Sequence, residues 1–376
     1  MIAIVCDTPY QLMSAIMVAC SFNNTDEPFV FFINTYLYHM EQSFDYSAGY
    51  PRIGSICYYG RKQMSAGLLL SGLINPLRML DSIEGFDRNI NLSCIISSRT
   101  TYIATYLYNY FQKKNPGLKL CLVEEGIGEY SSRLIHTRFT RVCAFLHKKT
   151  HLDRVSEAYF SAPDLYPYET GFPVKKVPPL TKEGREIIES MFNMQNIKDN
   201  NLLNSYSCVI LSEPTTVELK KQEDVDKYNR VEEDILDALA DVMGAENTVI
   251  KVHPIDPNFK NDKIKTYYTK LPMESLLLSM DADSKIFVSP MSTAMLTPRL
   301  LFGKVPFLVF TYKMLMGPIL AHVGDEAHLG RYIAFVNNFI AAYPDPSKCA
   351  APGSIGELKE VLFAFSARAK ELQTKD

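Results

Sequence analysis

The chain has 376 residues, of which 47% are hydrophobic and 22% are charged, and it carries a net charge of −3. This composition is typical of a globular protein of about two to three domains, and it excludes a mainly disordered, collagen-like or low-complexity chain. Proteins that bind nucleic acid through its phosphates are usually basic, so no nucleic-acid partner is expected.

Strands and helices are predicted to alternate through the first half of the chain. Short apolar runs predict strands at 1–6, 29–33, 53–58, 92–96 and 118–123. One helix is predicted to begin at Asp7-Thr8-Pro9, and another is predicted over 100–111. Such alternation indicates βαβ units and a parallel sheet. Residues 151–180 contain five prolines and no clear periodicity, and we interpret them as a connection between domains.

A second alternating pattern follows this connection. Strands are predicted at 207–211, 248–252, 285–288 and 305–310, and helices at 231–242, 273–280, 292–301 and 355–372. The last helix, for which Ser354 is the expected N-cap, has an apolar stripe of Leu358, Val361, Leu362 and Phe365. We expect this stripe to pack across the domain junction or against a membrane surface.

The predicted fold class is therefore α/β, with two Rossmann-like domains that face a central cleft and a C-terminal helix that crosses back. This is the GT-B architecture of many glycosyltransferases. The expected domains are an N-terminal domain over 1–175, a C-terminal domain over 176–354 and the closing helix over 355–376.

The eight cysteines show no CxxC spacing, so we expect buried thiols in a reducing compartment and no zinc ribbon. Asp7 interrupts the first apolar run and no basic segment precedes it, so no signal peptide is expected. Polar residues make 8–25 a poor membrane span. A cytoplasmic protein is predicted; a peripheral contact with the inner face of the cell membrane and a homodimer are left open.

Paired carboxyl groups follow the strand at 118–123, in Glu124-Glu125-Gly126. Ligands bind at the carboxyl ends of strands in open α/β sheets, and adjacent residues of a strand point to opposite faces. One carboxylate of the pair is thus a candidate general base, and the glycine permits the turn that follows. The alternative interpretation is a solvated strand end.

Two further features follow strands of the second half. His253 and Pro254 end the strand at 248–252, where the histidine can act as an acid or donate to a phosphate. Ser292 and Thr293 follow the strand at 285–288 and begin a helix, where hydroxyl and backbone N–H groups make an anion site. A structural histidine and a plain N-cap by Ser292 are the alternatives.

Two further segments match known ligand-binding motifs only weakly, and we expect no catalytic or binding role for them. The segment from Gly126 to Ser131 resembles a dinucleotide fingerprint, but serine replaces the third glycine and two carboxylates precede it. Asp281-Ala282-Asp283 matches the DxD of metal-dependent glycosyltransferases, but it precedes a strand instead of ending one, so we interpret it as a turn. No cofactor and no metal are expected.

The order of these motifs resembles the bacterial sialyltransferases of GT-B fold. Asp7-Thr8-Pro9-Tyr10-Gln11-Leu12 and Glu124-Glu125-Gly126-Ile127-Gly128 most resemble glycosyltransferase family 52, which sialylates lipooligosaccharides and capsules. The resemblance implies that Glu124 or Glu125 is the catalytic base and that His253 assists the departure of CMP. It implies donor-side roles for Ser292, Thr293, Glu274, Ser212, Pro254 and Gly126, and acceptor-side candidates at Asp7, Thr8, Pro9, Tyr10 and Gln11. The sequence departs from the family at Pro290 and Met291, where small residues are expected.

The predicted function is an inverting, metal-independent transfer of sialic acid from CMP-sialic acid to a sugar hydroxyl of a bacterial surface glycan, lipooligosaccharide or capsule. One alternative is a GT-B transferase that uses CMP-Kdo, CDP-glycerol or another nucleotide sugar. A second is a non-catalytic glycan- or nucleotide-binding protein.

Overall fold

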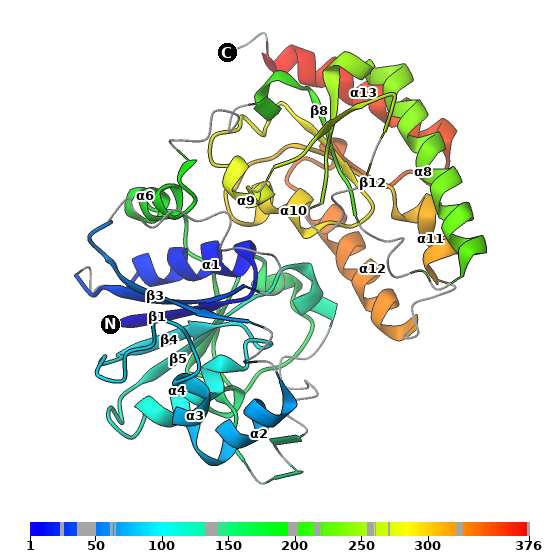
Figure 1. Ribbon diagram of the computed structural model, residues 1–376. Helices are drawn as coiled ribbons and strands as arrows, with labels where there is room; N and C mark the ends of the chain where they lie inside the picture. Colours follow the sequence, from blue (N-terminus) through cyan, green and yellow to red (C-terminus); the bar gives the residue numbers. More distant parts are fainter. Residues whose placement is uncertain are drawn as a thin grey trace. The chain divides into compact units, whose positions relative to one another are not determined.

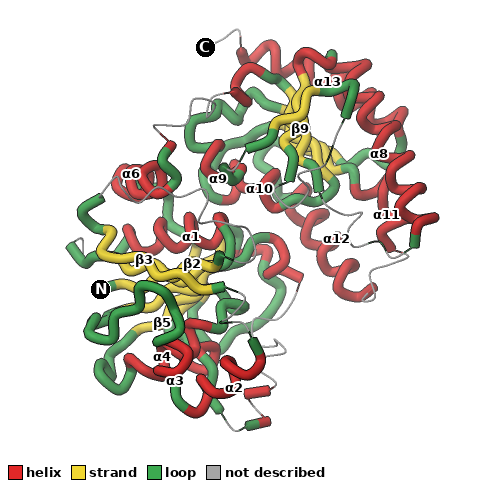
Figure 2. The backbone as a smooth tube through the Cα atoms, viewed as in Figure 1, coloured by secondary structure: helices red, strands yellow, loops and turns green. Residues whose placement is uncertain are grey.

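The chain divides into two units, Met1–Asn196 and Ile197–Asp376, and Figures 1 and 2 show that each is built on its own sheet with helices packed around it. The computed structural model describes residues 1–22, 26–35, 50–60, 63, 65–131, 142–143, 145–146, 148–194, 202–213, 219, 221–253, 259, 261–269, 271–320 and 326–373. The division lies later in the chain than residue 175, because helix α6 (Lys182–Met191) packs on the first helix of the chain.

The first unit contains a parallel sheet with the strand order β3-β2-β1-β4-β5-β6-β7. Its strands are β1 (Ile2–Cys6), β2 (Phe29–Asn34), β3 (Ile53–Tyr59), β4 (Cys94–Ser97), β5 (Lys119–Val123), β6 (Glu157–Phe160) and β7 (Val174–Lys176). Every residue of β1, β2 and β4 is buried, as expected for a parallel sheet that helices cover on both faces.

The interpretation of residues 151–180 as a connection between domains is wrong. This stretch supplies β6 and β7, which extend the sheet in parallel beyond β5. Its prolines stand where strand pairing does not need an N–H group: Pro163 opens a short 3-10 helix after β6, and Pro173 directly precedes the edge strand β7. The prolines that follow β6 and flank β7 masked these two short strands.

Helices α1 (Pro9–Cys20), α2 (Ala66–Ile74), α3 (Pro76–Leu80), α4 (Ile103–Phe111) and α6 belong to the first unit. The start of α1 follows directly from the sequence. Thr8 is its N-cap and accepts from the backbone N–H of Gln11, while the Gln11 side chain accepts from the Thr8 N–H. This capping box, with Pro9 in the first turn, fixes the point at which the chain leaves β1.

The second unit has a parallel sheet with the order β10-β9-β8-β11-β12-β13. Its strands are β8 (Cys208–Leu211), β9 (Thr248–Lys251), β10 (Lys265–Tyr267), β11 (Ile286–Ser289), β12 (Phe307–Phe310) and β13 (Cys349–Ala350). Its helices are α8 (Gln222–Met243), α9 (Met273–Leu276), α10 (Thr293–Leu300), α11 (Tyr312–Leu320), α12 (Glu326–Ala341) and α13 (Ile355–Gln373).

The apolar stripe of α13 packs inside the second unit and not across the domain junction or on a membrane, so that expectation is wrong. Leu358, Leu362 and Phe365 are buried in one core with Ile235 and Leu239 of α8. The separate closing segment predicted over 355–376 is therefore part of this unit. Ser354 caps the helix as predicted, accepting from the N–H of Glu357 at 3.3 Å.

Both sheets have the doubly wound strand order: the first strands of each unit are added toward one edge of the sheet, and the later strands are added toward the other edge. The reversal lies between β1 and β4 in the first sheet and between β8 and β11 in the second. Open α/β sheets bind their ligands at this point, outside the carboxyl ends of the strands. None of the helices in the described part of the chain combines the length and the apolar character that crossing a bilayer requires.

Candidate active site

Glu124, directly after β5, is fully buried and is the centre of a hydroxyl network. Its Oε1 accepts from the hydroxyl groups of Tyr10 and Ser161, and its Oε2 accepts from the hydroxyl of Tyr130. The Tyr130 oxygen accepts in turn from the N–H of Ala162 at 3.0 Å. The structure thus brings the predicted Glu124 and Tyr10 together, and it adds two residues that sequence reasoning missed.

Burial raises the pKa of Glu124 to about 7, while the hydrogen bonds from Tyr10 and Tyr130 act in the opposite direction. A carboxyl group with this pKa exchanges a proton near neutral pH, which is what general acid–base chemistry requires. The adjacent Gly126 has a φ of 111°, a conformation that favours glycine and turns the chain away after the acid pair.

Apart from Tyr10, which bonds to Glu124, the acceptor-side candidates divide into two groups. Thr8, Pro9 and Gln11 build the start of α1, as described above. Asp7 lies at the reversal point of the sheet, where its carboxylate accepts from Asn34 at 2.7 Å, from Tyr59 at 2.8 Å and from Thr101 at 3.1 Å. These four residues follow or end β1, β2, β3 and β4, so Asp7 ties four strand ends together.

Glu125 points into a different environment from Glu124. Its side chain is partly exposed and accepts from the N–H of Thr100 at 3.0 Å. Nε of Arg99 lies 3.9 Å from Glu125 and 3.4 Å from the fully buried carboxylate of Glu129. Burial raises the pKa of both glutamates, and Arg99 opposes that shift. Arg99 and Glu129 were not predicted as site residues.

The carboxyl edge of the second sheet brings together three of the predicted motifs. The loops after β9, β8 and β11 are neighbours there, and the hydroxyl of Ser212 accepts from the backbone N–H of His253 at 2.8 Å. Glu213 belongs to the Ser212-Glu213-Pro214 segment, which resembles the family's loop that lines the nucleotide cleft. Its Oε1 accepts from the Ser289 hydroxyl at 2.8 Å and from the N–H of Met291 at 3.0 Å. Glu213 therefore connects the β8 and β11 loops across the reversal point.

Ser292 is the N-cap residue of α10, but its hydroxyl makes no capping hydrogen bond to the helix. The alternative interpretation of Ser292 as an N-cap therefore holds for its position in the helix but not for its hydroxyl. Thr293 is the first residue of α10, and both side chains are partly exposed. The start of this helix thus presents backbone N–H groups and hydroxyls at the same edge as Ser212 and His253, which suits an anion.

Lys251, at the end of β9, is buried and interacts electrostatically with Glu274 of α9. Burial lowers the pKa of Lys251 to about 8, and burial raises the pKa of Glu274, each partner opposing the shift of the other. The predicted Glu274 thus lies beside the end of β9, two residues before His253. Pro254 lies outside the described residues.

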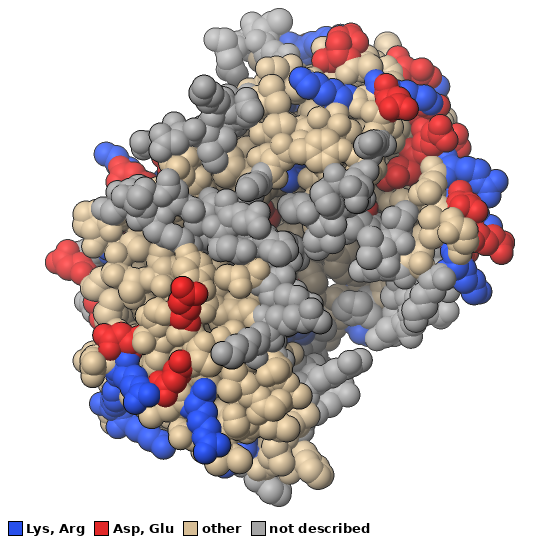
Figure 3. Space-filling view, in the orientation of Figure 1, with Lys and Arg blue, Asp and Glu red and all other residues tan. Residues whose placement is uncertain are grey.

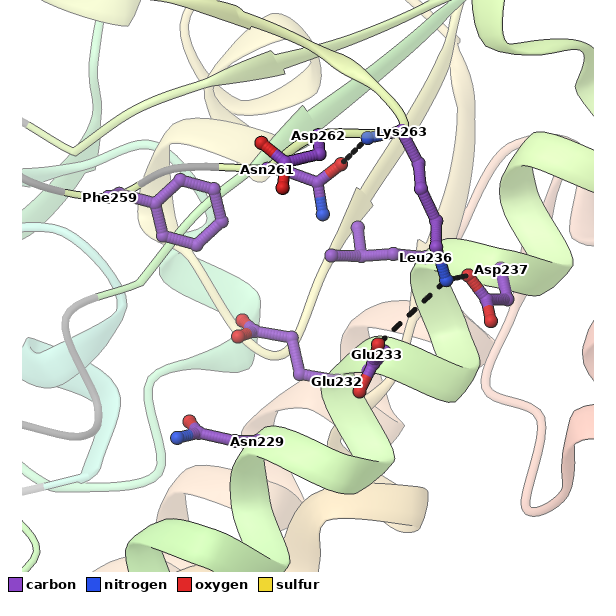
Figure 4. A pocket seen from close by; sticks show the side chains of 9 residues that line it. All are labelled: Asn229, Glu232, Glu233, Leu236, Asp237, Phe259, Asn261, Asp262 and Lys263. Carbon is purple, nitrogen blue, oxygen red and sulfur yellow. Dashed lines mark hydrogen bonds and ion pairs between the residues drawn. The ribbon is translucent and has the colours of Figure 1, made fainter.

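A cavity of about 270 Å³ lies on the flank of the second unit, between α8 and the side chains of Phe259, Asn261, Asp262 and Lys263 (Figure 4). Lys263 reaches across it to Asp237 at 2.5 Å and Glu233 at 3.8 Å, and its own N–H donates to Asn261 at 2.9 Å. None of the predicted site residues lines this cavity. Its polar groups close the loop against the helix.

The DxD match is a turn, as predicted. Ser284 donates to Asp281 at 2.7 Å and the Val305 N–H donates to Asp283 at 2.5 Å. Both carboxylates therefore stabilise the turn that precedes β11. Among the described residues, no cluster of three or more histidine, cysteine or acidic side chains has the arrangement of a metal site.

Comparison with solved structures supports the fold. Arabidopsis thaliana UGT89C1 complexed with UDP-L-rhamnose is 10% identical, with a TM-score of 0.50 over 100% of this chain and 92% of that chain. The spinosyn rhamnosyltransferase SpnG complexed with thymidine diphosphate is 12% identical, with a TM-score of 0.44 over 100% and 99%. With the two Rossmann-like units, the first likeness confirms the predicted GT-B fold.

No curated protein matches the chain. The sequence model of one family does match, over residues 71–311, and its description is alpha-2,8-polysialyltransferase (POLYST). The matched region contains Glu124, His253, Ser292 and Thr293, and it covers more than half of the chain. The predicted GT-B glycosyltransferase related to sialyltransferases is thereby confirmed, and this chain belongs to the alpha-2,8-polysialyltransferase family.

Proposed function

We propose that the protein is an inverting sialyltransferase that moves sialic acid from CMP-sialic acid to a terminal sugar hydroxyl of a bacterial lipooligosaccharide or capsule, without a metal ion. The observation that carries this proposal is the buried Glu124 carboxyl, held by three hydroxyls and with its pKa raised to about 7. The family match and the motif order that resembles glycosyltransferase family 52 support the choice of donor.

Glu124 is the proposed general base. Ser161, which is 5% exposed, covers Oε1, so an acceptor hydroxyl reaches this oxygen by replacing the Ser161 hydroxyl. The acceptor oxygen forms its bond to the anomeric carbon as the bond from that carbon to the CMP phosphate breaks, and the acceptor proton moves to Glu124. A single displacement of this kind inverts the anomeric carbon.

The second unit is the proposed donor side. The phosphate of the departing CMP takes hydrogen bonds from His253, Ser292, Thr293 and the N-terminal N–H groups of α10. A single phosphate carries less charge than a nucleoside diphosphate, so fixed donors of this kind supply the electrostatic stabilisation without a metal. The hydrogen bond from the His253 backbone N–H to the Ser212 hydroxyl, at 2.8 Å, fixes the position of the loop that follows β9. Glu274 is the candidate for the contact with the ribose of the nucleotide.

The test of the base is a comparison of Glu124→Gln with Glu125→Gln, in which kcat and the Kd for CMP are measured for each variant. We expect Glu124→Gln to lower kcat by about 10²–10⁴-fold with an unchanged Kd, because the base acts on the acceptor and not on the nucleotide. The Glu125 variant is the matched control and keeps most of its kcat. If both variants kept a kcat close to that of the wild type, neither glutamate would be the general base and the proposed mechanism would be wrong.

The test of the donor is hydrolysis and transfer with CMP-sialic acid, CMP-Kdo and CDP-glycerol in parallel. We expect turnover of CMP-sialic acid. Turnover of another donor alone would reassign the substrate, and turnover of none would favour a binding protein. In a CMP complex we expect the phosphate to lie within about 2.7–3.2 Å of a donor atom of His253, Ser292 or Thr293.

A further inference from the structure

Two consecutive residues after β8 bind the loops on either side of this strand. The Ser212 hydroxyl accepts from the backbone N–H of His253, in the loop after β9, at 2.8 Å. Oε1 of Glu213 accepts from the hydroxyl of Ser289, the last residue of β11, at 2.8 Å and from the N–H of Met291 at 3.0 Å. Because β8 lies between β9 and β11 in the sheet, these contacts set the spacing between the two loops. We call Ser212 and Glu213 the β8 clasp.

The contact between Glu213 and Ser289 lies away from bulk water at the Ser289 end, because Ser289 is 1% exposed. A hydrogen bond to a charged group is stronger than one between neutral groups, and a buried donor that loses its acceptor costs free energy. Removing the carboxylate would take away the acceptor of the Ser289 hydroxyl and of the Met291 N–H together. The β11 loop therefore depends on Glu213 for its position.

Met291 is held from a second side by α12. The hydroxyl of Tyr332 on this helix donates to the Met291 carbonyl at 3.2 Å. Burial and the nearby Glu213 carboxylate raise the pKa of Tyr332, so this hydroxyl remains a donor. Met291 directly precedes Ser292, the N-cap residue of α10. The contacts to the N–H and the carbonyl of Met291 thus determine where α10 begins and where its N-terminal N–H groups point.

The surroundings of Glu213 differ from those of many other acids of the second unit. Figure 3 shows acidic side chains along the position of α8, where Glu223, Glu233 and Asp234 are exposed. Exposed acids of this kind belong to a solvated helix surface. Glu213 instead accepts from two groups of a neighbouring loop at the carboxyl edge of the sheet. A carboxylate repels a phosphate, so we expect Glu213 to order this edge and not to bind the phosphate itself.

We infer that Glu213 is a positioning residue of the donor site: it holds Met291, and through Met291 the start of α10, at the place where the phosphate of CMP binds. The inference rests on the proposed function of the second unit as the donor side, and it adds a residue that acts without contacting the nucleotide. The contacts that Glu213 positions are those proposed for the phosphate at Ser292 and Thr293. Its effect should therefore be confined to the phosphate.

The test is calorimetric measurement of the Kd of the full chain for CMP and for cytidine, which lacks the phosphate. Glu213→Ala should raise the Kd for CMP by about tenfold and leave the Kd for cytidine within about twofold of the wild type. Glu213→Gln should keep the CMP affinity within about threefold of the wild type, because its amide oxygen accepts from the same two donors. Ser289→Ala removes one of these donors and should raise the Kd for CMP by about threefold, again with cytidine unchanged.

Glu246→Ala is the matched control. Glu246 is exposed in the short 3-10 helix Ala245–Asn247 that precedes β9, at the opposite edge of the same sheet, so its loss should leave both Kd values unchanged. An unchanged Kd for cytidine, together with cooperative thermal unfolding, shows that each variant is folded. If Glu213→Ala does not fold, Ser289→Ala decides the outcome, because it weakens the same contact by a smaller change.

Three results would overturn the inference while the proposed donor stands. The first is a Kd for CMP that stays at the wild-type value in both Glu213→Ala and Ser289→Ala. The second is an equal loss of CMP and cytidine affinity in Glu213→Ala, which would make Glu213 a contact of the nucleoside. The third is a Glu213→Gln variant as weak as Glu213→Ala. Wild-type protein that binds CMP no more tightly than cytidine would contradict the proposed donor site and this inference with it.

Discussion

The stability of the Glu124→Gln variant, measured relative to the wild type, should increase as the pH rises. In the folded protein, burial raises the pKa of Glu124 from 4.5 to about 7, so the native state holds this proton more tightly than the unfolded chain does. The contribution of Glu124 is therefore favourable below the unfolded pKa and is lost as the pH rises through the folded value. Glutamine fills the same space and does not titrate; its amide oxygen accepts from a hydroxyl as the carboxylate does, and its NH2 group donates instead.

The magnitude follows from the shift of the pKa. Each unit corresponds to about 1.4 kcal/mol, so the stability of the wild type should fall by about 2–3 kcal/mol relative to Glu124→Gln between pH 5 and pH 8. For a domain of about 150–250 residues, 1 kcal/mol changes Tm by about 2–4 °C. The Tm of the variant minus that of the wild type should thus increase by about 4–12 °C over this range.

The assay is thermal unfolding of both proteins at several pH values from 5 to 8. Glu157→Gln is a control of opposite sign: although burial opposes it, hydrogen bonds from Lys175 and Tyr159 leave the pKa of Glu157 lowered, so its removal should give no gain that grows with pH. A Tm difference between Glu124→Gln and wild type that stays constant or shrinks from pH 5 to pH 8 would refute the assignment of Glu124 as a buried, proton-exchanging acid.

Three further outcomes are expected. Tyr130→Phe removes a hydroxyl that lowers the pKa of Glu124, so kcat should fall by about fivefold at pH 7 and recover by pH 9 in a pH–rate profile, and a profile that does not move would contradict this. Ser212→Ala removes the acceptor of the His253 N–H and should weaken CMP binding by about tenfold in calorimetry, whereas unchanged affinity would separate this contact from the donor site. Turnover should persist in EDTA, and activity that Mg²⁺ or Mn²⁺ restores after chelation would assign a metal role to residues 281–283.

The sequence by itself determined the strands that carry the site and the points at which they end. Buried parallel strands are short apolar runs, so β1, β5, β9 and β11 were predictable within a few residues, and the polar groups that follow them are local in sequence. The capping box of α1 and the positive φ of Gly126 are likewise local properties. The order of the motifs was sufficient to predict the GT-B fold and a relation to sialyltransferases.

Only the tertiary structure decided which groups surround each motif. Tyr10 and Ser161 reach Glu124 from 114 and 37 residues away, because β1 and β6 lie in the same sheet as β5 and their carboxyl ends share its edge. The sequence pattern does not encode strand order, and the prolines that follow β6 hid the strand that delivers Ser161. The stripe of α13 was visible in the sequence, but its partner α8 was not. Periodicity shows that a face needs burial, whereas the choice among apolar surfaces depends on non-local packing.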